Sequence, residues 1–309
     1  MWSIEIGGFP FFQLYGFFII YSFLGWLMES IFVSVSNGRW INRGFISGPF
    51  CPIYGTGAVL VIVLLAPFQH NRMGLFLGGI VVATVLEYLI SFLLEKIFHA
   101  TWWDYSNMPF NLRGRICLIR SLEWGVLTVI MIRVIQPPIQ HFVEWIPQTL
   151  GEFLGVIILA YLILDTCITV MNIFQFKEKM ARLGETRLAL REKMENIKLF
   201  EARKDVLDYL ESLPIAEVVG NIKVKIEECT GQLVNLKEEE QLRLDLLMSE
   251  FKEKLDRHER ILRKSNITER RLMKAFPGLT FKKYNDEFRA FKKEILQKNK
   301  LDEKKGHRQ

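Results

Sequence analysis

The chain has 309 residues, half of them hydrophobic, and a mean hydropathy of +0.16. Residues 1–173 carry 8 Lys and Arg against 9 Asp and Glu, a net charge of −1, whereas the remaining residues carry 32 against 25, a net charge of +7. This division excludes a single soluble globular domain, and the four scattered cysteines exclude a disulfide-held secreted scaffold. We therefore expect an all-α chain with two parts. Residues 1–173 form a polytopic helical transmembrane domain, and residues 174–309 form a long, charged, coiled-coil-like cytoplasmic region.

Five apolar segments are candidates for membrane-spanning helices, each of which needs about 20 apolar residues. The five segments are residues 11–35, 54–68, 75–98, 118–135 and 150–174. The second segment is the shortest, and the fourth is the most polar. Lys and Arg gather in the first and third connections and after the fifth segment, whereas residues 137–150 contain none. Because basic loops face the cytoplasm, we expect a multi-pass protein of the cell membrane with its N-terminus outside and its C-terminus inside.

Several charged side chains fall inside these apolar segments. Charges at membrane depth are costly unless they are paired or hydrated, so each is a candidate functional group. Thr84, Glu87, Ser91 and Glu95 recur at helical spacing, which places them on one face of the third segment. If the polar faces of the helices turn inward, we expect one polar cluster that binds substrate, made of Glu29, Glu87, Arg115, Glu123 and Asp165. Structural pairing with an arginine is the alternative role for these charges.

Two connections have unusual compositions. Residues 37–57 are rich in Gly and Pro, and non-helical backbone at membrane depth is tolerated only where it lines a cavity or is buried in protein. Residues 102–117 contain aromatic side chains suited to the membrane interface and donors that suit an anion or a lipid headgroup. The candidates in this second loop are Trp103, Asp104, Tyr105, Asn111 and Arg113. A well-packed interfacial loop without a ligand is the alternative.

Three separated motifs follow one another in this part of the chain. They are Gly-Pro-x-x-Pro-Ile-Tyr-Gly-x-Gly at 48–57, Trp-Asp-Tyr-Ser at 103–106, and Asn-x-x-Gly-Arg-x-Cys-Leu-x-x-Ser-x-x-Trp-Gly at 111–125. Over about residues 14–135, this pattern resembles the bacterial membrane protein family called putative ABC-transporter type IV, or CmpB-like. The resemblance implies a transport permease and brings no established catalytic residues with it. It also implies that the ATPase is a separate polypeptide.

The charged half has apolar residues at helical spacing among dense Lys and Glu, which is typical of coiled-coil helices. Pro214 ends a first helix over about residues 172–213, and the next helical stretch reaches residue 276. We expect an antiparallel hairpin within one chain, with a parallel dimeric coiled coil as the alternative. Residues 281–295 form a basic helix with an aromatic face, which either lies on an anionic membrane surface or packs against the coiled coil.

Motifs for several chemistries are absent from the sequence. There is no P-loop, no Cys-x-x-Cys, no His-Glu-x-x-His and no Gly-x-Ser-x-Gly. We therefore expect no cofactor and no metal in this chain, and no nucleic-acid partner, because no binding motif supports one. Three functions stay open: a transport subunit, which would work as a homodimer because five spans make a small pathway; a membrane-embedded enzyme acting on a lipid or lipid-linked substrate; and a membrane-anchored coiled-coil scaffold.

Overall fold

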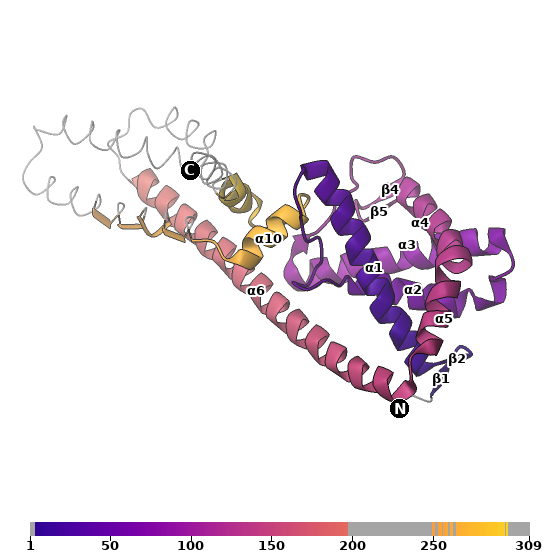
Figure 1. Cartoon of the computed structure of the whole chain (residues 1–309). Helices are drawn as coiled ribbons and strands as arrows, with labels where there is room; N and C mark the ends of the chain where they lie inside the picture. The colour runs from indigo at the N-terminus through magenta and orange to yellow at the C-terminus, as the bar shows by residue number, and fades with distance from the viewer. Residues whose placement is uncertain are drawn as a thin grey trace, which may run out of the picture. The chain divides into compact units, whose positions relative to one another are not determined.

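A computed structural model of the chain describes residues 4–196 and, apart from 251, 252, 255, 259, 262, 263 and 294, residues 249–295 (Figure 1). The described residues are mostly helical. The chain divides into two compact units. Unit 1 comprises Met1–Phe174 together with Arg271–Thr280, and unit 2 comprises Gln175–Arg270 together with Phe281–Gln309.

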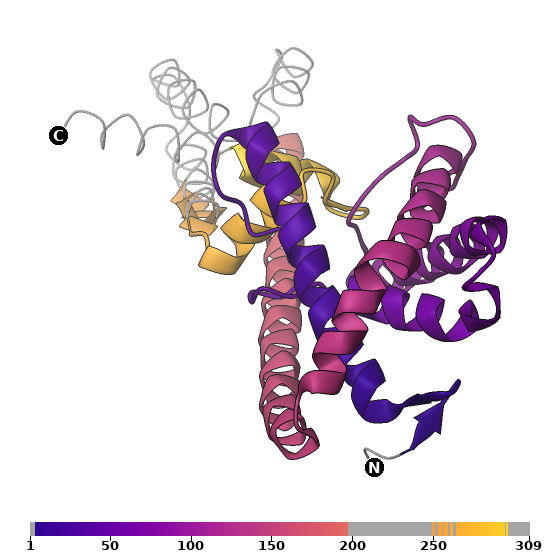
Figure 2. The same cartoon turned by 45° about the vertical axis from the view of Figure 1, so that its right-hand side comes forward.

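The helices are joined by short connections and a few two-residue strands. The α-helices are α1 (Phe11–Asn37), α2 (Pro52–Leu64), α3 (Arg72–Phe98), α4 (Leu118–Ile130), α5 (Gln136–Trp145), α6 (Gln148–Asn196) and α10 (Ile267–Ala275). A 3₁₀ turn, η1 (Ala66–Phe68), follows α2, and a π-helical segment, η2 (Met131–Ile135), joins α4 to α5. The strands are β1 (Glu5–Ile6), β2 (Phe9–Pro10), β3 (Ala100–Thr101), β4 (Asn111–Leu112), β5 (Ile116–Cys117) and β6 (Thr280–Phe281). The antiparallel hairpin of β1 and β2 leads directly into α1 (Figure 2).

Three helices are long and apolar enough to cross a membrane: α1, α3 and the Gln148–Ala189 part of α6. By itself α2 is about 20 Å long, which is less than the hydrocarbon core of about 30 Å. The chain from α4 through η2 to α5 is helical without a break, so the loop predicted over residues 137–150 is wrong for most of its length. Pro137 and Pro138 follow the π-helical segment directly, at the point where the hydrogen-bond register of the helix changes.

Within unit 1, successive helices run in alternating directions between two ends. At one end, rings from the connections after α1 and α3 and from α6 meet: Phe45 with Trp102, at 5.1 Å between centroids, and Phe98 with Phe174, at 5.4 Å. At the other end, the Arg133 guanidinium in η2 donates to the carbonyl oxygen of His70, just before α3, at 2.8 Å. The predicted basic connections, after α1 and after α3, therefore lie at the same end.

Glycines allow the closest helix contacts in unit 1. A Cβ on Gly25 of α1 would overlap the ring of Tyr54 in α2, and one on Gly79 of α3 would overlap the side chain of Thr128 in α4. Small residues at such crossings let backbones approach, which is the main source of van der Waals contact between helices in lipid. These two crossings fix α2 against α1 and α4 against α3.

Unit 2 is organised around the part of α6 that follows Gln175. The ring of Phe176 lies 5.3–5.9 Å from those of Phe281, Phe288 and Phe291, and all four side chains are almost completely buried. Residues 285–293 are helical, and their aromatic face packs on this part of α6. Of the two roles expected for the basic helix, packing against the protein is therefore the one that occurs, and its aromatic side chains are not available to a membrane surface.

Two further contacts show that the chain returns along α6 within unit 2. The Lys179 ammonium pairs with Glu269 at 2.9 Å, and the Arg187 charge contributes to the lowered pKa of His258. Glu269 therefore lies beside Lys179 and His258 near Arg187, so these described residues follow one another in the direction opposite to α6. The expected turn at Pro214 lies outside the described residues, as does most of the apolar stripe between 233 and 262.

Candidate functional site

Glu29 is held near the C-terminal end of α1 by one neutral and one charged partner. The hydroxyl of Tyr54, in α2, donates a short hydrogen bond to Glu29 Oε1, and Arg43 Nε lies 3.2 Å from Glu29 Oε2. Arg43 is in position because the connection after α1 folds back onto that helix. Its backbone N–H donates to the hydroxyl oxygen of Ser30 at 3.2 Å.

Glu87 lies in α3 and is only 8% exposed. The Tyr105 hydroxyl donates to Glu87 Oε1 and the Trp124 indole N–H donates to Glu87 Oε2, both at 3.2 Å. Trp124 also contacts the ring of Tyr54, with centroids 5.7 Å apart. The structure thus links the two predicted carboxylates, Glu29 and Glu87, through one pair of aromatic rings.

The loop between α3 and α4 positions Tyr105. Its backbone N–H donates to the Gly114 carbonyl at 2.8 Å, and the Trp103 indole donates to the Arg115 carbonyl at 3.0 Å. Asn111 closes the turn by accepting the Gly114 N–H at 3.1 Å. Burial, together with the nearby Glu87 carboxylate, raises the pKa of Tyr105 well above its usual range, so this phenol is neutral.

The other two predicted loop residues are exposed. Asp104 accepts the backbone N–H of Ser106 at 2.9 Å, and Arg113 has a left-handed backbone with φ of 55°. Of the five predicted loop residues, Trp103 and Asn111 therefore hold the loop, Tyr105 reaches Glu87, and the other two are exposed.

Arg115 has a partner of its own. Its guanidinium pairs with Glu95 of α3 at 2.7 Å, donates to the Tyr88 hydroxyl at 3.1 Å, and stacks over the rings of Tyr88 and Phe92 at 5.2 and 5.3 Å. This arrangement is the structural pairing that the sequence left open as an alternative. Arg115 therefore braces the loop against α3 and forms no ion pair with Glu29 or Glu87.

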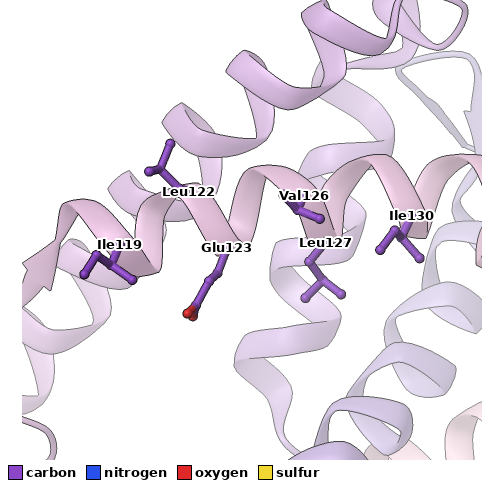
Figure 3. A pocket seen from close by; sticks show the side chains of 6 residues that line it. All are labelled: Ile119, Leu122, Glu123, Val126, Leu127 and Ile130. Atoms are coloured by element: carbon purple, nitrogen blue, oxygen red, sulfur yellow. The ribbon is translucent and has the colours of Figure 1, made fainter.

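Glu123 lies on the outer face of α4, beside an open apolar hollow of about 530 Å³ (Figure 3). It pairs with Arg120 at 2.6 Å, and both side chains are more than 40% exposed. The neighbouring side chains that line the hollow come from the same helix: Ile119, Leu122, Val126, Leu127 and Ile130. The structure does not bring Glu123 to the other predicted charges.

Asp165 of α6 grips the backbone of the connection between α1 and α2. It accepts the N–H groups of Ser47 at 3.1 Å and Gly48 at 2.7 Å. The guanidinium of Arg271, in the part of α10 that belongs to unit 1, donates to three carbonyl oxygens of the same connection: those of Gly44 at 2.6 Å, Phe45 at 2.9 Å and Ile46 at 2.9 Å. We call residues 44–48 the clamped loop. The Asp165 carboxylate thus accepts from the N–H groups of the clamped loop, and the Arg271 guanidinium donates to its carbonyl oxygens.

The five predicted charges are therefore divided among four sets of partners, and only Glu29 and Glu87 are connected. Tyr54, Trp124 and Arg271 were not among the predicted site residues. The first two lie in the motifs at 48–57 and 111–125, so those motifs could have identified them. Nothing near Arg271 in the sequence distinguishes it from the many other arginines of the charged half.

The chemistry that this site offers is acid–base and electrostatic. Among the described residues, no three His, Cys, Asp or Glu side chains gather as a metal site would require. Burial raises the pKa of the Cys51 thiol to about 12, so it is not a reactive thiolate. What remains is a pair of carboxylates in an aromatic setting inside a bundle of apolar helices.

A family model described as "Putative ABC-transporter type IV" matches residues 16–170. The match continues about 35 residues past the expected end at 135, and so it includes Asp165 of α6. No curated protein and no solved structure matches the chain.

Proposed function

The chain belongs to the family described as putative ABC-transporter type IV, and from that premise we propose that it is a permease-like membrane subunit whose transport is driven by a separate ATPase. The apolar helices and the family together fit a membrane protein associated with transport. A P-loop is absent from the sequence, so ATP hydrolysis requires another polypeptide. Two copies of the chain would supply the walls of the pathway.

One observation carries the proposal: Glu29 and Glu87 lie on two different apolar helices and are joined through Tyr54 and Trp124. Carboxylates inside apolar helices are expensive and mark substrate or ion pathways. Neighbouring aromatic faces add affinity for cations. The chemistry of this pair therefore favours a cationic substrate or coupling ion over an anionic one.

We propose five passes with the N-terminus outside and the C-terminus in the cytoplasm. The alternating helix directions in unit 1 support this count, with α2 as a short pass and α4, η2 and α5 together as one pass. The basic connections after α1 and α3 lie at the end where α6 becomes charged, which the positive-inside rule assigns to the cytoplasm. Single cysteines at positions 140 and 185 in a cysteine-free chain test the orientation. Labelling of position 185 from outside intact cells contradicts it.

The function is tested by ATP hydrolysis in a purified complex. The tagged chain is isolated with its ATPase, reconstituted in liposomes, and assayed for ATPase activity and for uptake of a panel of organic and inorganic cations. Glu29→Gln and Glu87→Gln should abolish stimulated hydrolysis and uptake. Glu144→Gln is the matched control, because Glu144 is exposed near the C-terminal end of α5 and, among the residues that the structure describes, is hydrogen-bonded to Gln140 alone.

Other outcomes would replace the proposal. Turnover of lipid by the purified chain without ATP, lost in Glu87→Gln, would make it a membrane-embedded enzyme. A complex whose ATPase activity ignores both substitutions would leave the scaffold role.

A further inference from the structure

Glu87 lies deep within α3, far from both ends of that helix. Along the helix it is about 22 Å from Arg72 and about 16 Å from Phe98. A helix that crosses a hydrocarbon core of about 30 Å therefore holds this carboxyl group inside the core. Its 8% exposure means that surrounding side chains, not water or lipid, fill its environment.

The partners of Glu87 are neutral. The Trp124 indole N–H and the Tyr105 hydroxyl each donate to one carboxylate oxygen. Within the described part of the chain, no Lys, Arg or His forms an ion pair with Glu87. The charge of Arg120 acts on Glu87, but its guanidinium is paired with Glu123 at 2.6 Å. A full negative charge at this position is therefore only partly compensated.

From this geometry we propose that Glu87 is a reversible proton-binding site within the membrane domain. A proton fits because it needs no cavity and no ring of oxygen ligands. A metal cation would need several oxygen ligands, and an indole N–H is a donor that cannot ligate one. The role of this proton in transport rests on the proposed function, whereas the proton-binding site itself does not.

The two donors suit both states of the carboxyl group. The indole N–H of Trp124 can only donate, so it stays on Oε2 in either state. The Tyr105 hydroxyl can donate or accept. Hydronium delivers one proton to Oε1 and leaves as water; the new O–H of Glu87 then donates to the Tyr105 oxygen, whose own hydrogen turns away. Release reverses these steps, and the number of protons balances in each direction.

By helical spacing, Thr84 and Ser91 share the face of α3 that carries Glu87. From other elements, Trp124 and Arg120 of α4 and Tyr105 in the loop between α3 and α4 act on Glu87. Tyr54 of α2 contacts Trp124 and holds Glu29 on α1. The only titratable carboxylate among them is Glu29, which is paired with Arg43 at 3.2 Å. Among the groups around this pair of carboxylates, Glu87 is thus the one whose hydrogen-bond partners are both neutral. Tyr105 connects it to the polar loop between α3 and α4.

The test is infrared difference spectroscopy of the purified full chain in nanodiscs of uncharged lipid, titrated with acid and without substrate or ATP. The wild type should gain the stretching band of a buried protonated carboxyl group, and Glu87→Gln should lose it. Glu144→Gln should keep it. Tyr105→Phe removes the hydroxyl that donates to the Glu87 carboxylate and favours its charged form. The midpoint of the carboxyl titration should therefore move by about one unit to higher pH.

Two results overturn the inference: no carboxyl band in the wild type, or the same band in Glu87→Gln. If Glu87→Gln does not elute as a monodisperse protein, the Tyr105→Phe midpoint decides, and an unchanged midpoint rejects the site. Proton binding is measured without transport, so the two tests can fail separately. If the chain fails the ATPase test but shows the carboxyl band, the proposed transport function is rejected and the proton-binding site is kept.

Discussion

Replacing Arg271 by methionine should open the clamped loop without unfolding the helices. Arg271 donates to three backbone carbonyls of residues 44–46, at 2.6–2.9 Å. Methionine replaces the aliphatic part of the side chain with an unbranched apolar one and removes every donor. The carbonyl oxygens of Gly44, Phe45 and Ile46 would then lose their partner beside Ile46, whose side chain is completely buried.

The magnitude follows from the number and kind of these bonds. A hydrogen bond to a charged group contributes about 1.5–3 kcal/mol, and three of them act together here. Burial of the guanidinium opposes this gain and lowers the pKa of Arg271, while the nearby Asp165 raises it. We therefore expect a net loss of about 3 kcal/mol, near the lower end for breaking a buried charged contact. This loss corresponds to about a 100-fold change in the opening equilibrium.

The assay is hydrogen exchange by mass spectrometry on the protein in nanodiscs. In Arg271→Met, peptides that contain residues 44–50 should exchange about 100-fold faster, while peptides from the middle of α3 should not change. In Arg271→Lys, the exchange rate of these peptides should lie between those of the wild type and Arg271→Met, because an ammonium group cannot form the same set of hydrogen bonds as a guanidinium. Arg133→Met is the control, since Arg133 is exposed and makes one bond of 2.8 Å to a carbonyl. Unchanged exchange at residues 44–50 in Arg271→Met would refute the reasoning.

Three further predictions concern stability. Gly79→Leu should separate α3 from α4 at Thr128 and lower the thermal midpoint in detergent, whereas an equal midpoint would mean that the crossing is loose. Phe288→Ala should cost about 3–5 kcal/mol in denaturant unfolding, because its ring is buried against Phe176; a loss below 1 kcal/mol would contradict this packing. Burial and, to a smaller extent, the charge of Arg187 lower the pKa of His258 from 6.5 to about 4. On acidification, His258 therefore takes up its proton at a higher pH in the unfolded chain than in the folded chain. Stability should fall between pH 6.5 and 4 by up to about 3 kcal/mol more than in His258→Gln, and parallel pH profiles would show that the side chain is accessible.

Much of the helical layout follows from the sequence, and the departures have physical causes. The apolar segments at 11–35 and 75–98 correspond closely to α1 and α3, because long apolar runs leave few alternatives in lipid. The helix α5 was not predicted, because the pattern at residues 137–150 indicates a loop between two apolar segments. Pro137 and Pro138 lie instead directly after the π-helical segment, where the hydrogen-bond register changes.

The candidate site could be predicted only in part. Charge in an apolar segment was enough to single out Glu29, Glu87 and Asp165, because such residues are rarely without a role. Their partners depend on which helix faces meet in three dimensions. The prediction of a single cluster did not allow for the separate partners that each charged side chain finds nearby. Tyr105 was assigned to an interfacial loop, yet its hydroxyl reaches Glu87. Periodicity alone contains no information about such a contact.

The position of Arg271 in the chain has a consequence for synthesis. Unit 1 is not finished when Phe174 has been made, because residues 175–270 must be made before Arg271 is added. At a translation rate of about 5–20 residues per second, this delay is roughly 5–20 s. During that time α1 to α5 and the first part of α6 have been made, but the carbonyl oxygens of residues 44–46 lack the Arg271 donor. A nascent chain that stalls before Arg271 would therefore lack the donor to the carbonyl oxygens of residues 44–46.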